Sequence, residues 1–413
     1  MGAQALHVVS VGVGPLAGAD PVSGRVVNAL AAAGVPVTTR VFVDEDEAAL
    51  ESALAAPGGV TIVVAGPGGS AGDVVRRVLA RVTGTRLALN DRMLAALEDA
   101  YRRIDRPLPR RADRLALLPQ GAALSIIEGG EPAWTLETER GAFVVLPRGA
   151  DAALDAVIAE HVVPLARARL AARGAGAVRT LKTAGVPVAD LEERLADWLG
   201  QEGDVSVVIV PVDGEAWVRI RARGTTPADA AERVASAEAA IAAALGGDLY
   251  GRDADTLETA VGALLRAQGL VLAVAESCTG GLVGHRLTGI AGSSAWFERG
   301  VVVYSNEAKM ELLGVPEAVL RAHGAVSAES ADAMVRGICA IARTPCGLSI
   351  TGIAGPDGGT PTKPVGTVFI GAAARDRVVT RRFRFIGDRA SVKWQSSSMA
   401  LDMLRRMLGG VSP

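Results

Sequence analysis

A run of nine residues, AVAESCTGG at positions 273–281, places two hydroxyls and a thiol between apolar residues and a glycine pair. We expect a buried strand that turns tightly into a helix, which places Ser277 at the carboxyl edge of a parallel sheet, where open α/β folds bind ligands. The first N–H groups of such a helix have no partner inside it and can stabilise an oxyanion. Ser277 is therefore a candidate nucleophile, with Thr279, Gly280 and Gly281 as candidate oxyanion and substrate contacts. The alternative is that Ser277 or Thr279 only caps the helix.

Cys278 is a rival nucleophile next to Ser277. A small buried thiol is a common core residue, and none of the neighbouring motifs supplies a suitably placed histidine, so we rank the thiol below the hydroxyl. The other cysteines, Cys339 and Cys346, bring the total to three, without metal-ligand spacing. We therefore expect neither a disulfide framework nor a metal site.

A second segment, VVVYSNEAK at positions 301–309, puts Lys309 in the first turn of a predicted helix. A capping box favours Glu there and the helix dipole disfavours a cation, so a local rule is broken, as functional sites often do. A partly buried lysine in that turn can act as a general base near neutral pH. Tyr304, expected at the end of the preceding strand, is placed to share its hydrogen-bond network. The alternative is a solvated lysine beside a core tyrosine.

Lysine is informative in this chain because it is rare. The sequence contains 39 arginines but only four lysines, Lys182, Lys309, Lys363 and Lys393. Lysine can lose its proton in a protein, whereas arginine effectively cannot. A lysine kept where arginine is the usual cation is thus a candidate for chemistry.

A third segment, LSITGIAGPDGGT at positions 348–360, reads as a strand that runs into a glycine-rich loop. Glycines let consecutive N–H groups face a bound phosphate, so Thr351, Gly352 and Gly355 are candidate substrate contacts. No Gly-Lys-Ser/Thr follows, so this is not a Walker loop. Arg389, at the start of the last predicted helix, adds a guanidinium suited to phosphate or carboxylate. The alternative is a plain glycine-rich turn.

The elements that must hold these residues alternate along the chain. Strands are predicted at 6–13, 36–43, 59–66 and 142–146, and helices at 22–34, 45–56, 73–83, 91–105 and 151–173. This alternation predicts βαβ units and a parallel sheet.

The middle of the chain has a different texture, with helices at 188–199 and 227–245 and strands at 205–212 and 216–223. It resembles a small KH-like α+β fold. Its Gly200-Gln-Glu-Gly203 run matches a nucleic-acid-clamping loop, but it joins a helix to a strand and is flanked by acids. We interpret it as a helix cap and turn.

The last part is predicted as a second α/β unit. Helices are expected at 255–267, 280–287, 307–313, 327–342 and 389–408, and strands at 270–275, 300–304, 347–350, 366–372 and 377–385. The three chemical segments all lie in this unit.

Composition sets the outer limits. The 413 residues are enough for two or three domains, and 43 basic against 45 acidic side chains give a net charge of −2. Disorder is excluded, and so is a strong pull toward nucleic acid or a membrane surface from net charge alone. The uncharged stretch 52–72 is interrupted by prolines and glycines, and the first residues lack the positive region of a signal peptide. We expect a cytoplasmic protein.

Several motifs together resemble one family. AESCTGG, IAGSSAWFERGVVVYSNEAK, HGAVS, TGIAGPDGG, KPVGTV and GDR look like the nicotinamide-nucleotide amidase (nicotinamide mononucleotide deamidase) domain that ends the CinA competence/damage-inducible proteins. The resemblance implies three α/β or α+β domains: a molybdopterin-binding-like domain at 1–170, a KH-like linker domain at 171–250 and the amidase domain at 251–413.

The resemblance implies an amidohydrolase that converts nicotinamide mononucleotide into nicotinic acid mononucleotide and ammonia. Ser277 is then the nucleophile, and Tyr304, Lys309 and Arg389 belong to the catalytic or substrate-binding set, with Lys309 as base directly or through Tyr304. No cofactor or metal is implied. The resemblance also suggests a homodimer and links the family with competence and RecA.

The N-terminal region departs from the family pattern. The first strand is followed by Gly12-Val13-Gly14 where relatives carry Gly-Thr-Glu, and of a later pair of aspartates in relatives only Asp73 is left, with Gly72 in place of the other. The family turn Gly-Pro-Pro is replaced by residues 147–149. ADP-ribose pyrophosphatase activity needs carboxylates that hold a metal near a diphosphate, so we expect it to be weak or lost.

Two other functions are considered. A non-catalytic nucleotide-binding partner of competence or DNA-damage proteins would bind its ligand without releasing ammonia. A short-chain-dehydrogenase-like oxidoreductase uses Tyr-x-x-x-Lys on one helix, whereas Tyr304 and Lys309 are five apart across a strand–helix junction. One helical face does not align them, and we discount that function.

Overall fold

The computed structural model describes residues 5–12, 20–44, 46–55, 59–65, 69–103, 105–110, 112–127, 132–147, 152–170, 175–201, 203–212 and 214–412. The chain divides into two compact units, residues 1–178 with 222–233 and residues 179–221 with 234–413. The domain boundaries expected near residues 170 and 250 stay predictions. Within the described ranges no helix is long and apolar enough to cross a membrane.

The first unit is built on a six-stranded sheet of order β2-β1-β3-β8-β7-β6. Its strands are β1 (Ala5–Val11), β2 (Thr39–Val43), β3 (Gly59–Val64), β6 (Ala123–Ser125), β7 (Ala133–Thr138) and β8 (Gly141–Leu146). The first four neighbours pair in parallel, as predicted, and β7 and β6 add an antiparallel edge. A separate pair joins β4 (Leu87–Leu89) to β5 (Leu117–Pro119).

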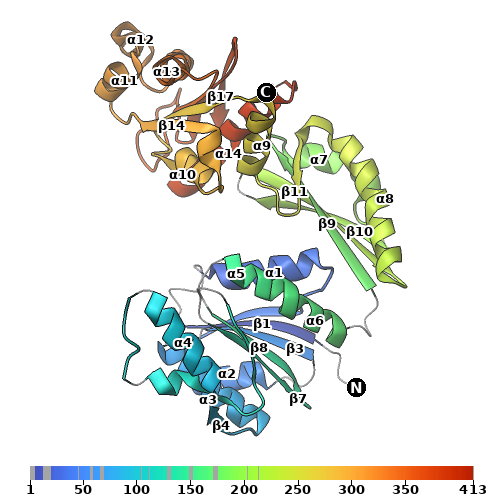
Figure 1. Cartoon of the computed structure of the whole chain (residues 1–413). Coiled ribbons are helices and arrows are strands. Elements are labelled where there is room, and N and C mark those ends of the chain that lie inside the picture. Colours follow the sequence, from blue (N-terminus) through green and yellow to red (C-terminus); the bar gives the residue numbers. More distant parts are fainter. Residues whose placement is uncertain are drawn as a thin grey trace. The chain divides into compact units, whose positions relative to one another are not determined.

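Helices cover both faces of this sheet (Figure 1). One face carries α1 (Pro21–Ala32), α5 (Ala152–Val157) and α6 (Val163–Leu170), the last two joined by a π-helical turn; the other carries α2 (Glu47–Leu54), α3 (Gly69–Thr83) and α4 (Asp91–Arg103). Asp20 and Asp46 cap α1 and α2 through their carboxylates. This arrangement confirms the α/β fold expected here.

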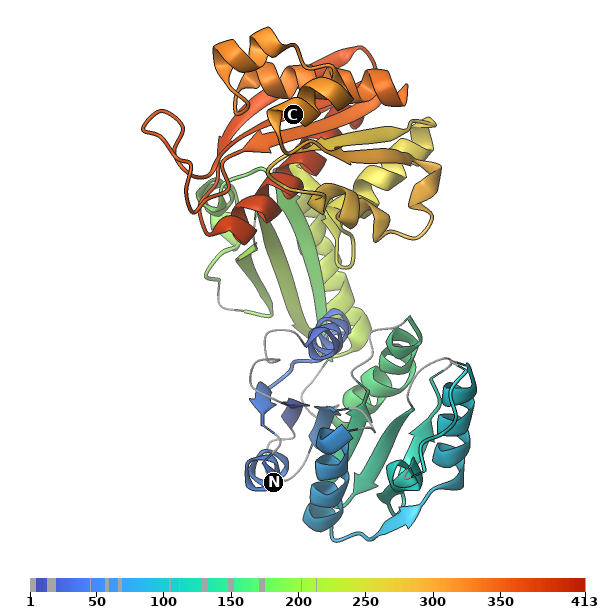
Figure 2. The ribbon, with the colours of Figure 1, turned by 90° about the vertical axis from the view of Figure 1, so that its left-hand side faces the viewer.

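The middle of the chain forms a four-stranded sheet of order β10-β11-β9-β12. Its elements are β9 (Ala175–Ala184), α7 (Val188–Arg194), β10 (Val205–Val212), β11 (Glu215–Gly224), α8 (Pro227–Leu245) and β12 (Leu249–Arg252). Figure 2 shows α8 running along the strands. The predicted helix 188–199 ends early, at Arg194, and continues only as a 3₁₀ turn over Ala196–Trp198. Gly200 follows with φ of 68°, and Glu202 lies outside the described residues.

The C-terminal sheet has the order β14-β13-β15-β16-β17. Its elements are α9 (Leu257–Gln268), β13 (Leu272–Glu276), α10 (Leu282–Thr288), β14 (Phe297–Val302), α11 (Asn306–Leu313), α12 (Glu317–His323), α13 (Ala328–Ala342), β15 (Cys346–Gly352), β16 (Thr367–Ala374), β17 (Arg377–Arg384) and α14 (Arg389–Leu408). β14, β13 and β15 are parallel, and β16 and β17 return antiparallel. Helices α9, α10 and α14 share one apolar core with the sheet, and α12 and α13 share the other.

Some elements differ from the prediction. Strand β14 ends at Val302, so Tyr304 lies beyond the strand and not at its end. The helix α12 and the strands β9 and β12 were not predicted, because their short or alanine- and glycine-rich sequences carry no clear apolar period.

One buried ion pair fixes α10 against its neighbours. The Arg286 guanidinium binds the Glu258 carboxylate of α9, and its Nη1 donates to the Ser397 and Ser398 hydroxyls of α14 at 2.6 and 3.0 Å. Arg286 also lies over the ring of Trp394. Because a buried guanidinium must keep its partners, α10 and the turn before it are held firmly on α14.

Candidate active site

The three parallel strands of the C-terminal sheet end side by side. Glu276, the last residue of β13, pairs with Val302 of β14 and Ile350 of β15. The Ser277 N–H donates to the Ile350 carbonyl at 2.9 Å, and the Val303 N–H donates to the Glu276 carbonyl at 2.8 Å. Since β14 and β15 flank β13 on opposite sides, this edge is a topological switch point of the kind where α/β folds bind ligands.

The turn that carries Ser277 is shaped by the residue before it. The buried Glu276 carboxylate accepts hydrogen bonds from the N–H groups of Gly281, Val283 and Gly284 at 2.9–3.1 Å. Gly280 and Gly281 have φ of 61° and 94°, the left-handed region that a side chain disfavours. The chain thus leaves the sheet, bends back and starts α10 with its first N–H groups tied to Glu276.

This capping changes the oxyanion expectation. Among the predicted donors at 279–281, the Gly281 N–H is bound to Glu276 and the Gly280 N–H donates to the Ser277 carbonyl at 3.1 Å. Within the described chain, the Thr279 N–H has no partner. The start of α10 is therefore closed to an anion, and Thr279 is the donor that stays open.

The Thr279 side chain adds an unsatisfied polar atom beside the nucleophile. It is fully buried, and its Oγ1 has no hydrogen-bond partner in the described part of the chain. A buried hydroxyl without a partner costs free energy. A bound polar ligand would remove that cost.

Lys309 meets Ser277 inside the protein. Ser305 caps α11 by accepting from the Ala308 N–H at 3.0 Å, which makes Lys309 the fourth helical residue. Its side chain is 1% exposed, and its Nζ lies 3.2 Å from the Ser277 Oγ. The carbonyls of Val303, Tyr304 and Ser305 surround the same nitrogen at 2.8, 3.3 and 3.3 Å.

Burial lowers the pKa of the Lys309 ammonium, because a charge that has lost its water is disfavoured. As a neutral amine, Lys309 has one lone pair and two N–H groups that can donate hydrogen bonds to the carbonyls. With the two donors held by carbonyls, the lone pair is left for the Ser277 hydroxyl. The arrangement suits a general base.

The thiol next to Ser277 is in a different state. Cys278 is 6% exposed, and burial raises its pKa to about 12. A thiol needs to become a thiolate to attack. Cys278 is therefore a protonated core residue in the hydrophobic cluster of this domain.

Tyr304 and Arg389 form a second pair at the surface. Tyr304 is 62% exposed, and its hydroxyl accepts from Arg389 Nη2 at 2.9 Å, while Arg389 Nη1 donates to the Gly355 carbonyl at 2.7 Å. Tyr304 meets Lys309 only through its backbone carbonyl. The structure thus joins Ser277 directly to Lys309 and joins Tyr304 to Arg389.

The glycine-rich segment completes the edge. Thr351 directly follows Ile350, the partner of Ser277, and its hydroxyl donates to the Ala325 carbonyl at 2.8 Å. Gly352 packs so closely on β16 that a Cβ there would come within 2.9 Å of the Thr367 carbonyl. Gly355 has φ of 84° and accepts from Arg389. All three lie on the same sheet edge as Ser277, and their contact with substrate stays a prediction.

Comparisons with known proteins agree with the resemblance in the sequence. The family model described as the CinA C-terminal domain matches residues 254–408, and the damage-inducible protein CinA KH domain matches residues 178–251. A CinA-like protein of Geobacter sulfurreducens is 38% identical over 392 residues, 94% of this chain and 95% of that protein. The chain belongs to the CinA family.

Other members of the CinA family are similar to the same degree. A CinA-like protein of Syntrophus aciditrophicus is 39% identical over 386 residues, 92% of this chain and 91% of its own. A solved CinA superfamily protein of Klebsiella pneumoniae is 38% identical and covers 37% of this chain and 96% of its own, with a TM-score of 0.37. The family-level prediction is confirmed; these names do not specify a reaction.

Two residues at the site were given no role in the sequence analysis. Glu276 was interpreted only as part of the strand and turn, and its capping role depends on how the chain folds back. Lys393 of α14 lies beside Gly280, since a Cβ on that glycine would be 3.8 Å from its Nζ. The rarity of lysine was the signal that pointed to Lys393.

Acidic residues do not gather around this CinA site in a way that suits a metal. In the ranges that the structure describes, no group of three or more His, Cys, Asp or Glu side chains could hold a metal ion. The polar groups next to Ser277 are an amine, a hydroxyl and backbone N–H groups. This donor set fits acyl transfer to a hydroxyl.

The lowered pKa of Lys309 predicts a pH-dependent contribution to stability. The unfolded chain has a lysine of ordinary pKa, ~10.4, so between the two pKa values it binds more protons than the folded chain. The free energy of unfolding contributed by Lys309 must then rise with pH in that window, by up to about 1.4 kcal/mol per pH unit.

Urea unfolding of the wild type and of Lys309→Met, from about pH 7 to about pH 10, measures this effect. The free energy of unfolding of the wild type should rise relative to that of Lys309→Met as the pH rises. Lys182, whose pKa burial also lowers, is present in both proteins and cancels. Parallel stability curves would mean that Lys309 has an ordinary pKa.

Proposed function

We propose that the C-terminal domain hydrolyses the amide of nicotinamide mononucleotide to nicotinic acid mononucleotide and ammonia. The observation that carries the proposal is the 3.2 Å approach of the buried Lys309 amine to the Ser277 hydroxyl at the sheet edge. The motif resemblance supplies the substrate. A nucleophile with an adjacent base is the arrangement that acyl transfer requires.

In the first half-reaction, the Lys309 amine takes the proton of Ser277 as its Oγ attacks the amide carbon. The carbonyl oxygen becomes negative and is stabilised by the free N–H of Thr279. The C–N bond then breaks, the Lys309 ammonium gives its proton to the leaving nitrogen, and ammonia departs. An ester of Ser277 is left.

In the second half-reaction, Lys309 takes a proton from water, which attacks the ester carbon. The same N–H group holds the second oxyanion. Collapse releases the carboxylate product and returns the proton to Ser277. Lys309 thus begins and ends each half-reaction as an amine, which is why its lowered pKa matters.

Exposed groups around the nucleophile support binding of a nucleotide. Arg389 is fixed by the Gly355 carbonyl and by Tyr304, so its guanidinium loses little freedom when it binds an anion. Tyr304, which binds Arg389, is 62% exposed and offers its ring at the surface. The remaining polar contacts come from the Thr351–Gly355 segment.

Substituting the two neighbouring nucleophiles separates hydroxyl from thiol chemistry. Ser277→Ala should lower the rate of ammonia release from nicotinamide mononucleotide by about a thousandfold or more, because the attacking oxygen is removed. Cys278→Ala, the matched control one residue away, should keep most of the activity. Loss of activity in the cysteine variant alone would assign the reaction to the thiol.

The second test concerns the proton acceptor. In the wild type the rate should rise with pH through an apparent pKa well below ~10.4. Lys309→Arg should be nearly as damaging as Lys309→Ala, because arginine keeps the charge but does not accept the proton. An active Lys309→Arg protein with an unchanged pH profile would remove Lys309 from the mechanism.

We further propose that the N-terminal unit has lost pyrophosphatase activity. Asp73, the acid that persists there, is bound by Arg76, and its Oδ2 lies 3.5 Å from Arg114. Gly72 stands beside it in α3 where relatives have a second acid, while Gly14 lies outside the described residues. A carboxylate paired with two arginines is poorly suited to a divalent cation.

ADP-ribose hydrolysis tests this part of the proposal. The purified protein should release little or no AMP from ADP-ribose, with or without Mg²⁺ or Mn²⁺. Ammonia release from nicotinamide mononucleotide in the same preparation is the control for folded protein. Strong metal-dependent AMP release would show that other carboxylates have taken over.

The quaternary state and location rest on the family resemblance. We propose a cytoplasmic homodimer on that basis, and a link with RecA rests on the same resemblance.

A further inference from the structure

Lys393 is a cation without a partner at the edge of the active site. The other three lysines all donate to protein oxygens: Lys182 to the Asp255 carbonyl, Lys309 to the groups described above, and Lys363 to the carbonyls of His323 and Val326. In the described part of the chain, Lys393 makes no such hydrogen bond and no ion pair. It is half-buried on α14.

The position of Lys393 is set by two neighbours. Arg389 lies four residues earlier on α14, so both cations project from one face of that helix. Gly280 lies under the ammonium: a Cβ there would be 3.8 Å from Nζ. The Gly280 N–H donates to the Ser277 carbonyl at 3.1 Å, so the ammonium lies beside the same turn that carries the nucleophile.

In the described part of the chain, neither Lys393 nor Arg389 forms an ion pair with the nearby acids, Glu276 and Asp388. The Glu276 carboxylate is used by three N–H groups of α10, and the Asp388 carboxylate accepts from the Ser391 N–H at 2.8 Å. The surface next to Ser277 therefore carries two positive groups on one helix face. Such a pair fits a dianion better than a single negative charge.

We propose that Lys393 selects for the phosphate of the substrate, binding it together with Arg389 while the amide lies at Ser277. This inference rests on the proposed function. Nicotinamide mononucleotide has a positive pyridinium ring at its reacting end and a phosphate at the other. Repulsion keeps the ring away from Lys393, and attraction draws the phosphate to it, so the two cations fix the direction in which the substrate enters.

The experiment compares two substrates that differ only in phosphate, nicotinamide mononucleotide and nicotinamide riboside. Lys393→Gln keeps the length of the side chain and removes its charge. We expect kcat/KM for the mononucleotide to fall about 10- to 100-fold, mainly through KM, as for a lost charged hydrogen bond. The value for the riboside should stay within about twofold, and Lys393→Arg should restore most of the mononucleotide activity.

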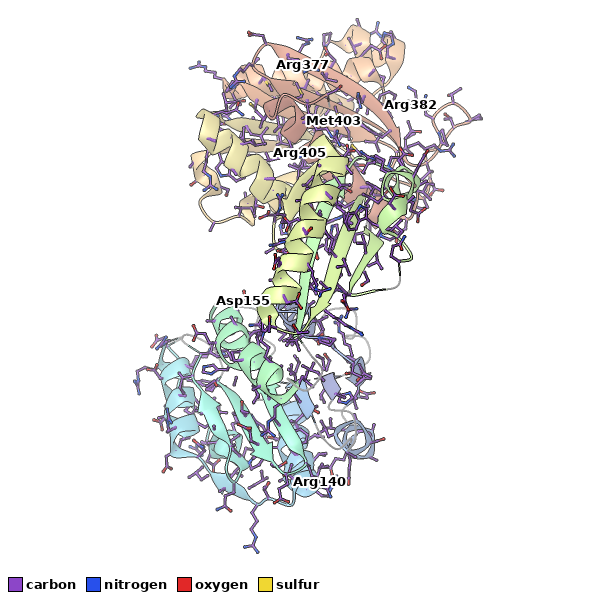
Figure 3. All side chains as sticks on the ribbon, turned by 90° about the vertical axis from the view of Figure 1, so that its right-hand side faces the viewer. Arg140, Asp155, Arg377, Arg382, Met403 and Arg405 are labelled. Atoms are coloured by element: carbon purple, nitrogen blue, oxygen red, sulfur yellow. The ribbon has the colours of Figure 1, made fainter. Side chains whose placement is uncertain are left out.

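Arg377→Gln is the matched control. Figure 3 shows Arg377 on β17, and it pairs with Ala374, opposite Cys346 at the other end of the sheet from Ser277. This substitution removes one positive charge and should change kcat/KM for neither substrate. Inorganic phosphate gives a second measurement: it should inhibit the wild type competitively and inhibit Lys393→Gln about tenfold more weakly.

The outcomes separate this inference from the proposed function. If the wild type releases ammonia and Lys393→Gln has an unchanged ratio of mononucleotide to riboside activity, Lys393 does not select phosphate. Equal loss of both substrates would likewise overturn the inference, because it would assign Lys393 a structural role. If the wild type releases no ammonia from the mononucleotide, the proposed function itself fails, and this inference fails with it.

Discussion

The candidate site of the C-terminal domain depends on the burial of one amine, that of Lys309. Lys309 reaches from the first turn of α11 to Ser277 and is 1% exposed. The three carbonyls of residues 303–305, directly after β14, accept hydrogen bonds from its nitrogen. Burying a cation there is costly, so folding lowers the pKa of Lys309. The ends of β13, β14 and β15 must meet at one edge for this contact to form. The sheet order, with β13 in the centre, provides that meeting point.

The Ser277 turn depends on a second buried group that works differently. Three N–H groups at the start of α10 take the place of water around the buried Glu276 carboxylate. Those same N–H groups would otherwise attract the substrate phosphate or the oxyanion. In the proposed mechanism, Glu276 occupies these groups, so the oxyanion binds the Thr279 N–H and the phosphate binds side chains. In that mechanism, the oxyanion and the phosphate bind different groups because of the Glu276 carboxylate.

Much of the fold and part of the site were predictable because they rest on local signals. The strands β1, β3, β8 and β13 are apolar runs, and α8 and α14 begin and end where their periodicity does. Lys309 was predicted because a lysine in the first turn of a helix breaks a local rule. Ser277 was predicted because it lies where a strand turns into a helix. The pairing of Tyr304 with Arg389, the capping by Glu276 and the place of Lys393 beside Gly280 depend on contacts distant in sequence or on the path of a loop. Local patterns hold no information about those contacts.

The two kinds of cation at this site differ in burial, since Lys309 is 1% exposed whereas Arg389 lies at the surface and Lys393 is half-buried. The pKa of Lys309 is lowered by its own burial, while the electrostatic influence of Glu307 opposes the change. Neither Arg389 nor Lys393 is among the causes. A phosphate bound by those two cations would therefore leave in place the burial that lowers the pKa of Lys309. If the proposed function holds, an anion can bind there without removing the cause of the lowered pKa of the proposed base, whereas a site that lowered that pKa by cation–cation repulsion would lose the effect when the anion binds.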